Sequence, residues 1–432
     1  MADILASQRI RRIQTVALVL LTIGGVINYV DRATLAVGLP LIRRDLHLSL
    51  TESGVLSSAF LWAYAVFQLP AGPLIDRFGA RWLLSAGLAL WSLAQVLGGL
   101  VGSLAQFIVA RVLLGVGESP QFPSCARVVA DWFHQRERGS ATGIWNCSST
   151  LGTAIGLPLL TYLMLHLGWR WMFAVMGFFG LAIAGVIFWL HRDPGQVPHL
   201  TPDERRYLTG DLPEGPSVTW RAWRRLFRSR TIWGMIGGYC GANYCIWIYT
   251  AWLPQYLELQ YHVTVARTGW IGSIPFLCGA AGSIVTGRVC DGLLRRGFSP
   301  ISSRKLPMIV SLVGVAVFTV LSSRAATAGE AVAEISASLF LLYGAACTAW
   351  TMATAVAPAA YAASIGSIQN FFGYLAAAFA PAITGYIAAK TGSFQPALLF
   401  GAGVALAGAA VNLLLVRKPL ELGAAGLSAP AE

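Results

Sequence analysis

The chain has 432 residues, of which 56% are hydrophobic and only 12% are charged. Soluble domains carry about 25% charged residues, so this deficit excludes an ordinary soluble domain and indicates a protein whose solvent is lipid. The net charge of +12 would suit a nucleic-acid-binding protein, but the positions of the basic residues, given below, exclude that class.

Apolar stretches recur along the whole chain. Each is long enough, or nearly so, to cross a hydrocarbon layer of about 30 Å as a helix. The sequence therefore predicts an all-α membrane protein with twelve transmembrane helices. In chain order they are 14–39, 52–73, 81–102, 104–132, 139–165, 171–190, 231–256, 267–290, 305–322, 331–352, 361–389 and 394–416.

The basic residues are distributed unevenly between the two sides of these spans. With the N-terminus placed in the cytoplasm, 22 of the 31 Lys and Arg residues fall on the cytoplasmic side, six on the other side and three within spans. This bias is typical of inner-membrane proteins and predicts that both termini are cytoplasmic. The positive charge therefore reflects topology, and we expect no nucleic-acid partner.

A hydrophilic interruption divides the chain into two sets of six spans. We expect an N-terminal six-helix bundle at 1–190, a cytoplasmic linker at 191–230, a C-terminal six-helix bundle at 231–417 and a cytoplasmic tail at 418–432. Near the end of the linker, aromatic residues recur at helical spacing among arginines. This pattern predicts an amphipathic helix that lies on anionic lipid; its aromatic residues are Trp220, Trp223 and Phe227.

An internal repeat supports the division into halves. Gly72 is followed four residues later by Asp76, and Gly287 is followed four residues later by Asp291, with the two aspartates 215 residues apart. Parallel six-helix halves of this kind belong to one class of secondary carriers.

Four charged residues lie inside the first and fourth spans: Asp31, Arg32, Arg111 and Glu118. Each would cost about 2.5–3.5 kcal/mol near the bilayer centre, so we expect them to pair. Helical spacing places Arg111 and Glu118 on one face, and estimated depth brings Asp31 level with Glu118. We expect Asp31 to pair with Arg32 or Arg111, leaving Glu118 to titrate. The alternative is a buried network that only locks two helices together.

The repeated loop resembles the signature of the major facilitator superfamily, and the resemblance implies that fold. In such a loop a glycine permits close helix approach, the aspartate can cap or pair at a helix end, and the arginines reach carboxylates or helix ends. The residues assigned to this signature and its surroundings are Gly72, Asp76, Arg77, Gly79, Arg81, Asp131, Gly287 and Asp291. Arg127, nearer the cytoplasm than Glu118, is expected to extend toward the membrane surface.

Further motifs resemble the anion:cation symporter branch of that superfamily. They occupy residues 28–33, 111–123, 131–139, 249–257 and 366–373. The resemblance implies a proton-coupled carrier of sugar acids or other organic acids, with Asp31 and Glu118 as the proton-coupling pair. It makes Arg32 and Arg111 counter-charges or ligands of a substrate carboxylate. The chain departs from the pattern at Ser149, where some sugar-acid carriers have glutamine, and at 353–358, where relatives often have a Ser-Asp pair.

Other polar residues within spans could contact substrate hydroxyls or equally serve as hydrogen bonds between helices. These candidates are Tyr29, Tyr64, Asn146, Ser149, Gln369 and Asn370.

Other function classes find little support. None of the three lysines, Lys305, Lys390 and Lys418, follows a glycine as a phosphate-binding loop requires, which argues against an ATP-driven pump. The seven cysteines lie within or beside spans without ligand spacing, and no catalytic cluster stands out. We therefore expect no enzyme, no metal and no cofactor besides the coupling proton.

The sequence thus predicts a monomeric proton symporter for a small organic anion in the lipid bilayer of a bacterial inner membrane. A uniporter or anion exchanger of the same fold, and a carrier of aromatic carboxylates, remain as alternatives.

Overall fold

The computed structural model describes residues 6–48, 50–198, 200–209, 223–224, 226–263, 265–356, 359–417 and 420. Within these residues the chain is helical and contains no strand. The helices are α1 (Gln8–Asp45), α2 (Leu50–Phe78), α3 (Ala80–Leu100), α4 (Leu104–Glu118), α5 (Gln121–Trp132), α6 (Arg138–Asn146), α7 (Ser148–Leu190), η1 (Pro194–Gln196), α8 (Pro202–Thr209), α10 (Arg230–Tyr261), α11 (Val265–Arg295), α12 (Ser302–Ser322), α13 (Ala328–Ala353), η2 (Ala359–Tyr361), α14 (Ala362–Thr391) and α15 (Gln395–Leu415).

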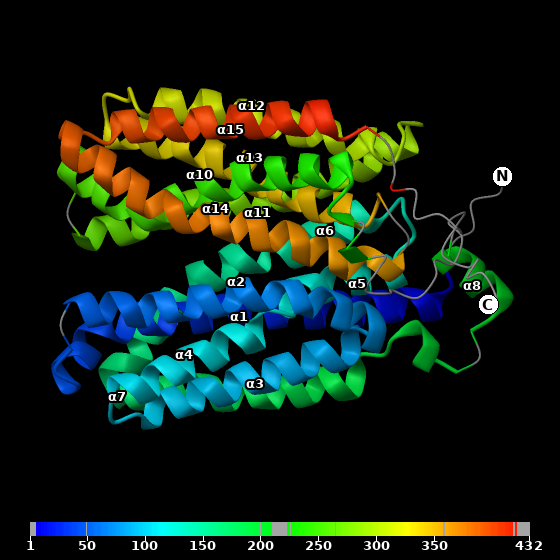
Figure 1. Ribbon diagram of the computed structural model, residues 1–432, viewed down its shortest axis with the longest axis horizontal. Coiled ribbons are helices and arrows are strands. Elements are labelled where there is room, and N and C mark those ends of the chain that lie inside the picture. Colours follow the sequence, from blue (N-terminus) through cyan, green and yellow to red (C-terminus); the bar gives the residue numbers. More distant parts are fainter. Residues whose placement is uncertain are drawn as a thin grey trace, which may run out of the picture.

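The helices form two bundles that lie side by side (Figure 1). The N-half, α1 to α7, forms most of the lower bundle in that view, and the C-half, α10 to α15, forms the upper bundle. The start of α1, the end of α15 and helix α8 lie at one end of the molecule, which we call the terminal end. By length and composition, eight of the described helices could each cross a membrane.

Two expected spans are broken, and a bend joins the second of them to the span that follows. The span expected at 104–132 is interrupted at Pro120, which has no N–H to continue the ladder of α4. The span expected at 139–165 is interrupted at Cys147, between α6 and α7. Helix α7 in turn bends at Gly168, whose φ of 80° is accessible mainly to glycine, and so supplies two rods. When α4 and α5 are counted as one rod, α6 and the first part of α7 as another, and the second part of α7 as a third, the described helices make twelve rods.

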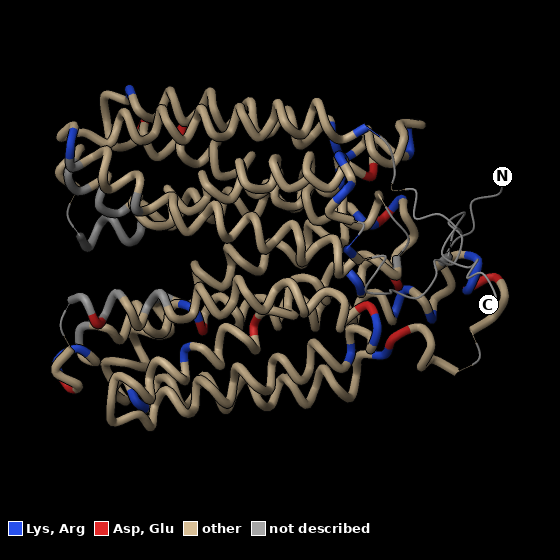
Figure 2. The backbone as a smooth tube through the Cα atoms, in the orientation of Figure 1, with Lys and Arg blue, Asp and Glu red and all other residues tan. Residues whose placement is uncertain are grey.

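The basic residues gather at the terminal end of the bundle (Figure 2). This arrangement agrees with the charge bias of the sequence. The same view shows charged residues at mid-depth within the N-half. Buried charged residues of the C-half, among those described, are Asp291 and Arg304, and both belong to the terminal end.

The expected amphipathic helix lies mostly outside the described residues, which exclude 210–222 and 225. Trp223 is described, and the expectation that it faces lipid is wrong. Its side chain is buried in a cluster that includes Ile232 and Ile301 of the C-half, and its ring contacts that of Phe227 at 5.1 Å.

The linker helix α8 is fastened to the N-half by a polar cluster around Glu137. Arg11 of α1 donates two hydrogen bonds to the Glu137 carboxylate, at 2.8 and 2.6 Å. Tyr207 of α8 donates a third at 2.7 Å. Burial alone would raise the pKa of Glu137, but the bonds from Arg11 and Tyr207 outweigh it and lower that pKa below its ordinary value.

We expect Glu137→Gln to lower the melting temperature in detergent by about 1–2 °C near pH 7, since exposed ion pairs contribute only about 0.2–1 kcal/mol. Because the folded pKa of Glu137 lies below its ordinary value of 4.5, this stabilisation is present above pH 4.5 and is lost as the pH falls through the folded pKa. The difference between wild type and variant should therefore shrink as the pH falls below 4.5. Glu334→Gln, an equal charge change on α13, serves as the control, and a difference that persists at low pH contradicts the assignment.

Candidate functional site

The intramembrane charges of α1 and α4 meet at mid-depth in the N-half. The side chains of Asp31 and Glu118 are fully buried, and Arg111 is only 4% exposed. Arg32 lies beside them with a side chain that is 11% exposed. Burial of an ionisable group without a partner is costly, so the partners of these four groups decide how the cluster is stabilised.

Arg32 is the centre of this cluster. Its Nε donates a hydrogen bond to Oε2 of Glu118 at 2.7 Å, which is also an ion pair. Its Nη1 donates to the hydroxyl of Tyr374 in the C-half at 2.6 Å. Four aromatic rings surround the guanidinium within 6 Å of their centroids, an arrangement that stabilises a cation. They belong to Tyr29, Phe60, Tyr64 and Tyr374.

Asp31 is held by helix α3 and makes no ion pair with either arginine, contrary to the sequence expectation. The indole Nε1 of Trp91 donates to Oδ2 at 3.0 Å, and Nε2 of Gln95 donates to Oδ1 at 3.1 Å. The two acids therefore have different partners: neutral donors hold Asp31, whereas a cation holds Glu118.

Several buried polar atoms of the cluster have no hydrogen-bond partner among the described residues. They are Nε and Nη1 of Arg111, Nη2 of Arg32, Oε1 of Glu118 and both amide atoms of Asn28. Arg111 packs its guanidinium over the ring of Phe60 at 5.1 Å. Unpartnered buried groups are rare, so their concentration here marks a place where a polar or anionic ligand would complete the bonding.

The C-half closes this site with polar and aromatic side chains. Asn370 on α14 donates from Nδ2 to the hydroxyl of Tyr64 at 3.1 Å and accepts from the hydroxyl of Tyr239 at 3.0 Å. The rings of Tyr64 and Tyr374 lie 4.7 Å apart. The site is thus formed between the halves, by α1, α2 and α4 on one side and α10 and α14 on the other.

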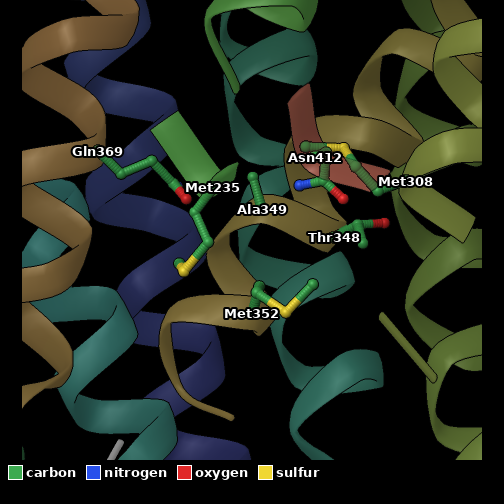
Figure 3. Close-up of a pocket in the computed structure, with 7 residues that line it drawn as sticks. All are labelled: Met235, Met308, Thr348, Ala349, Met352, Gln369 and Asn412. Carbon is green, nitrogen blue, oxygen red and sulfur yellow. The ribbon is translucent and has the colours of Figure 1, made fainter. Parts of the chain in front are cut away.

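Gln369 does not join this group. Both of its amide atoms lack a partner among the described residues, and its side chain lies at a packing gap inside the C-half that has no room for a water molecule (Figure 3). The other side chains around this gap are Met235, Met308, Thr348, Ala349, Met352 and Asn412.

An aromatic layer lies between the charged cluster and the terminal end. The ring of Phe122 contacts those of Trp145 and Trp350 at 5.4 and 5.8 Å, and the two tryptophans contact each other at 5.7 Å. Both tryptophans are 1% exposed, so the layer seals the two halves together.

Asn146 and Ser149 belong to this closed region. Asn146 donates to the hydroxyl of Ser283 in the C-half at 3.0 Å. Ser149 donates to the backbone carbonyl of Asn146 at 2.9 Å, which leaves its hydroxyl committed within its own segment.

Asp76 connects the halves at the terminal end. Its carboxylate accepts hydrogen bonds from the backbone N–H groups of Ala363 and Ser364, at 3.2 and 2.8 Å, where α14 begins. A carboxylate at a helix N-terminus satisfies free donors and the helix dipole. Gly72 makes this approach possible, because a side-chain carbon there would collide with the hydroxyl of Ser367 and the backbone of Ser364.

Asp291 makes the equivalent connection in the opposite direction. It accepts from the backbone N–H groups of Gly139 and Ser140, at 2.8 and 2.6 Å, where α6 begins. Gly287 lies against Gly139, with no room for a side chain. Each half therefore caps a helix of the other, and the bundles are joined at the terminal end.

The remaining signature residues support these caps. Arg127 pairs with Asp76 at 3.2 Å and with Asp131 at 2.8 Å, instead of extending to the membrane surface as expected. Arg81 donates to the carbonyl of Phe188 at the end of α7 at 2.9 Å.

Two further signature residues have local roles. Gly79 has a φ of 89° and ends the turn between α2 and α3. Arg77 is exposed and lies over the ring of Phe78.

Sequence reasoning did not find Trp91, Gln95, Phe60 or Tyr374. A signal for two of them exists: Gln95 is a polar residue inside an apolar span, and Tyr374 follows Asn370 by four residues and so shares its helix face. In the described part of the chain, no three His, Cys, Asp or Glu residues gather closely enough to hold a metal ion.

The family model described as "Major Facilitator Superfamily" matches residues 21–381. The chain belongs to the major facilitator superfamily. It is a transporter and not an enzyme, as the sequence predicted. The predicted twelve-helix fold in two halves is confirmed.

Curated relatives cover almost the whole chain. A probable L-galactonate transporter of Escherichia coli strain K12 is 42% identical over 417 residues, covering 96% of this chain and 92% of that protein. A D-galactonate transporter of E. coli O6:H1 is 31% identical, covering 96% of this chain and 97% of that protein. A probable galactarate/D-glucarate transporter of Bacillus subtilis is 32% identical, covering 90% of this chain and 89% of that protein.

Solved structures share the fold at low identity. The proton:xylose symporter XylE matches with a TM-score of 0.73 at 15% identity, covering 95% of this chain and 98% of that one. FucP in an outward conformation matches with a TM-score of 0.71 at 13% identity, covering 94% of this chain and 100% of that one.

Loss of charge at one cap should loosen the terminal end. We expect Asp291→Asn to raise the maleimide labelling rate of Cys347, which is fully buried beside Gly139, by roughly tenfold, because hydrogen bonds to charged groups contribute about 1.5–3 kcal/mol. Peptide mass spectrometry measures labelling at Cys347 separately from the other cysteines. Asp45→Asn, which breaks an exposed ion pair with Arg170 at the opposite end, should leave the rate unchanged. Equal rates in wild type and Asp291→Asn contradict the role of the cap.

Proposed function

We propose that this protein is a proton-coupled symporter that takes up a sugar acid by alternating access. The observation that carries the proposal is the Arg32–Glu118 ion pair, which lies between the two halves beside unpartnered donors of both arginines. The names of the relatives, transporters of galactonate, galactarate and glucarate, support the substrate class.

Arginine suits a carboxylate ligand because its planar fork donates two parallel hydrogen bonds and stays charged. In the proposed cycle the substrate carboxylate binds Arg32, whose Nη2 has no partner among the described residues, and displaces Glu118. Glu118 takes a proton as it loses its cation, since a buried carboxylate without a partner is strongly disfavoured. One anion and at least one proton then move together.

The second arginine and second acid have supporting roles in this proposal. Arg111 lies two helical turns from Glu118 on the same helix, toward the end opposite the terminal end. It provides a positive charge that attracts the anion toward Arg32. Asp31 is the second proton-coupling acid, held by Trp91 and Gln95.

The neutral side chains around the charges support a substrate rich in hydroxyls. Hydroxyl and amide groups of Tyr29, Tyr64, Asn370 and Tyr239 can exchange their present bonds for bonds to such a substrate. The protein is proposed to act in a bacterial inner membrane with both termini in the cytoplasm, which makes the terminal end the cytoplasmic end.

Uptake into proteoliposomes tests this function. We expect galactonate or a related sugar acid to accumulate above its external concentration when the pH gradient is directed inward, and only to equilibrate when the gradient is absent. The panel includes L-galactonate, D-galactonate, galactarate, D-glucarate and an aromatic acid such as benzoate. Equilibration without accumulation under every gradient contradicts symport and supports a uniporter, while preference for the aromatic acid contradicts the substrate class.

Glu118→Gln separates binding from coupling. The amide keeps the shape of the side chain but cannot take up a proton, so gradient-driven accumulation should be lost while counterflow at equal pH continues. Glu330→Gln, an equal change at an exposed position on α13, serves as the control. Normal accumulation by Glu118→Gln contradicts its assignment as a proton-coupling residue.

A further inference from the structure

Tyr374 connects the charged cluster of the N-half with helix α14 of the C-half. Its hydroxyl accepts a hydrogen bond from Nη1 of Arg32 at 2.6 Å. The same guanidinium donates from Nε to Glu118 at 2.7 Å. Arg32 therefore lies between an acid of one half and a tyrosine of the other, and its orientation depends on both.

Helix α14 also carries one of the caps at the terminal end. The N–H of Ser364, in its first turn, binds Asp76, and Tyr374 follows ten residues later, about 15 Å along the helix. Asp76 in turn pairs with Arg127 on α5, which continues the rod that carries Glu118 on α4. Helix α14 is thus linked twice to the rod formed by α4 and α5. Arg32 makes the link at mid-depth, and Asp76 makes it at the terminal end.

We propose that Tyr374 is the positioning residue through which the charge of Glu118 controls the attachment of the C-half. This role rests on the proposed function. While Glu118 is charged, it holds Arg32 in the orientation that reaches Tyr374. When Glu118 is neutral, or when a carboxylate takes its place, Arg32 reorients and α14 loses a bond to the N-half.

A bond present in only one state can shift an equilibrium between conformations, whereas a contact common to both cannot. The hydrogen bond to the hydroxyl of Tyr374 meets that condition, because Arg32, which donates it, also binds Glu118. The ring of Tyr374 has other neighbours, Tyr64 at 4.7 Å and Trp247 at 6.2 Å. Tyr374→Phe keeps these ring contacts and removes the hydroxyl that Arg32 binds, so it tests the proposed connection.

Other ionisable groups face this region and must be considered in any pH effect. Asp31 and Arg111 interact electrostatically with Glu118 from α1 and α4. Five tyrosines also lie nearby, one each on α1, α2, α10, α13 and α14. They are Tyr29, Tyr64, Tyr239, Tyr343 and Tyr374. Among these groups, Glu118 and Tyr374 accept hydrogen bonds from Arg32 at 2.7 and 2.6 Å.

The test compares wild type, Tyr374→Phe and Tyr249→Phe in proteoliposomes with L-galactonate as the probe. Tyr249→Phe is the matched control, because it removes a buried tyrosine hydrogen bond to Thr319 within the C-half, away from Arg32. We expect Tyr374→Phe to lower the accumulation ratio under an inward pH gradient by roughly tenfold, the size expected for one hydrogen bond to a charged group. Counterflow at equal pH should persist, and Tyr249→Phe should accumulate like wild type.

A second readout follows the conformation directly. The labelling rate of Cys347 without substrate is divided, at each pH, by its rate in the denatured protein, which removes the effect of thiol ionisation itself. This ratio should differ between pH 6 and pH 8 in wild type, and the difference should be largely lost in Tyr374→Phe. The double variant Glu118→Gln/Tyr374→Phe should behave like Glu118→Gln alone, because both substitutions interrupt one connection.

The outcomes separate this role from the proposed function. A wild-type protein that never responds to the pH gradient contradicts proton coupling itself, and the role of Tyr374 with it. A responsive wild type with equal accumulation by Tyr374→Phe contradicts only the role of Tyr374. Loss of both accumulation and counterflow, or an equal loss in Tyr249→Phe, shows a structural contribution and also overturns it.

Discussion

The buried ion pair between Arg32 and Glu118 is the interaction on which the rest of the site depends. Removal of one partner from a buried pair typically costs about 3–5 kcal/mol, because the other charge is left without compensation. The protein can therefore separate the two residues only if something replaces each partner. A carboxylate can replace Glu118 at Arg32, and a proton can replace Arg32 at Glu118. This reciprocal requirement is the physical basis of the proposed link between an anion and a proton.

The two acids of the cluster differ in how far their influence can extend. Asp31 is bound by Trp91 and Gln95, so its surroundings lie wholly within the N-half. Glu118 is bound to Arg32, which also reaches Tyr374 across the interface. In the proposed mechanism, a change of charge at Glu118 is transmitted to the other half through one intervening side chain, whereas a change at Asp31 first affects α3.

The connections at the terminal end follow from the internal repeat. Each half contributes an aspartate that caps a helix of the other half, Asp76 on α14 and Asp291 on α6. Because the acceptors bind backbone N–H groups, the connection depends on helix position more than on side-chain identity. The aromatic layer of Phe122, Trp145 and Trp350 adds apolar burial above it. In the proposed alternating-access cycle, opening of this end breaks both caps.

The sequence by itself determined the membrane class, the helical rods, the two halves and the buried charges. These follow from the length of the apolar stretches, the uneven distribution of Lys and Arg between the two sides of the membrane, and the spacing of the internal repeat. All three are local or periodic properties of the chain. It did not determine where rods are broken, as at Pro120 and Cys147, since other spans contain prolines that leave the helix intact, such as Pro275.

Only the tertiary structure decided the partners. Asp31 and Arg32 are neighbours in sequence, yet they point to α3 and to the interface, because successive residues on a helix are turned by about 100°. The sequence placed Glu118 among the charges without showing that Arg32 binds it and Tyr374 together. Such a contact joins residues more than 250 positions apart, and it depends on how two bundles are packed, which no local pattern encodes.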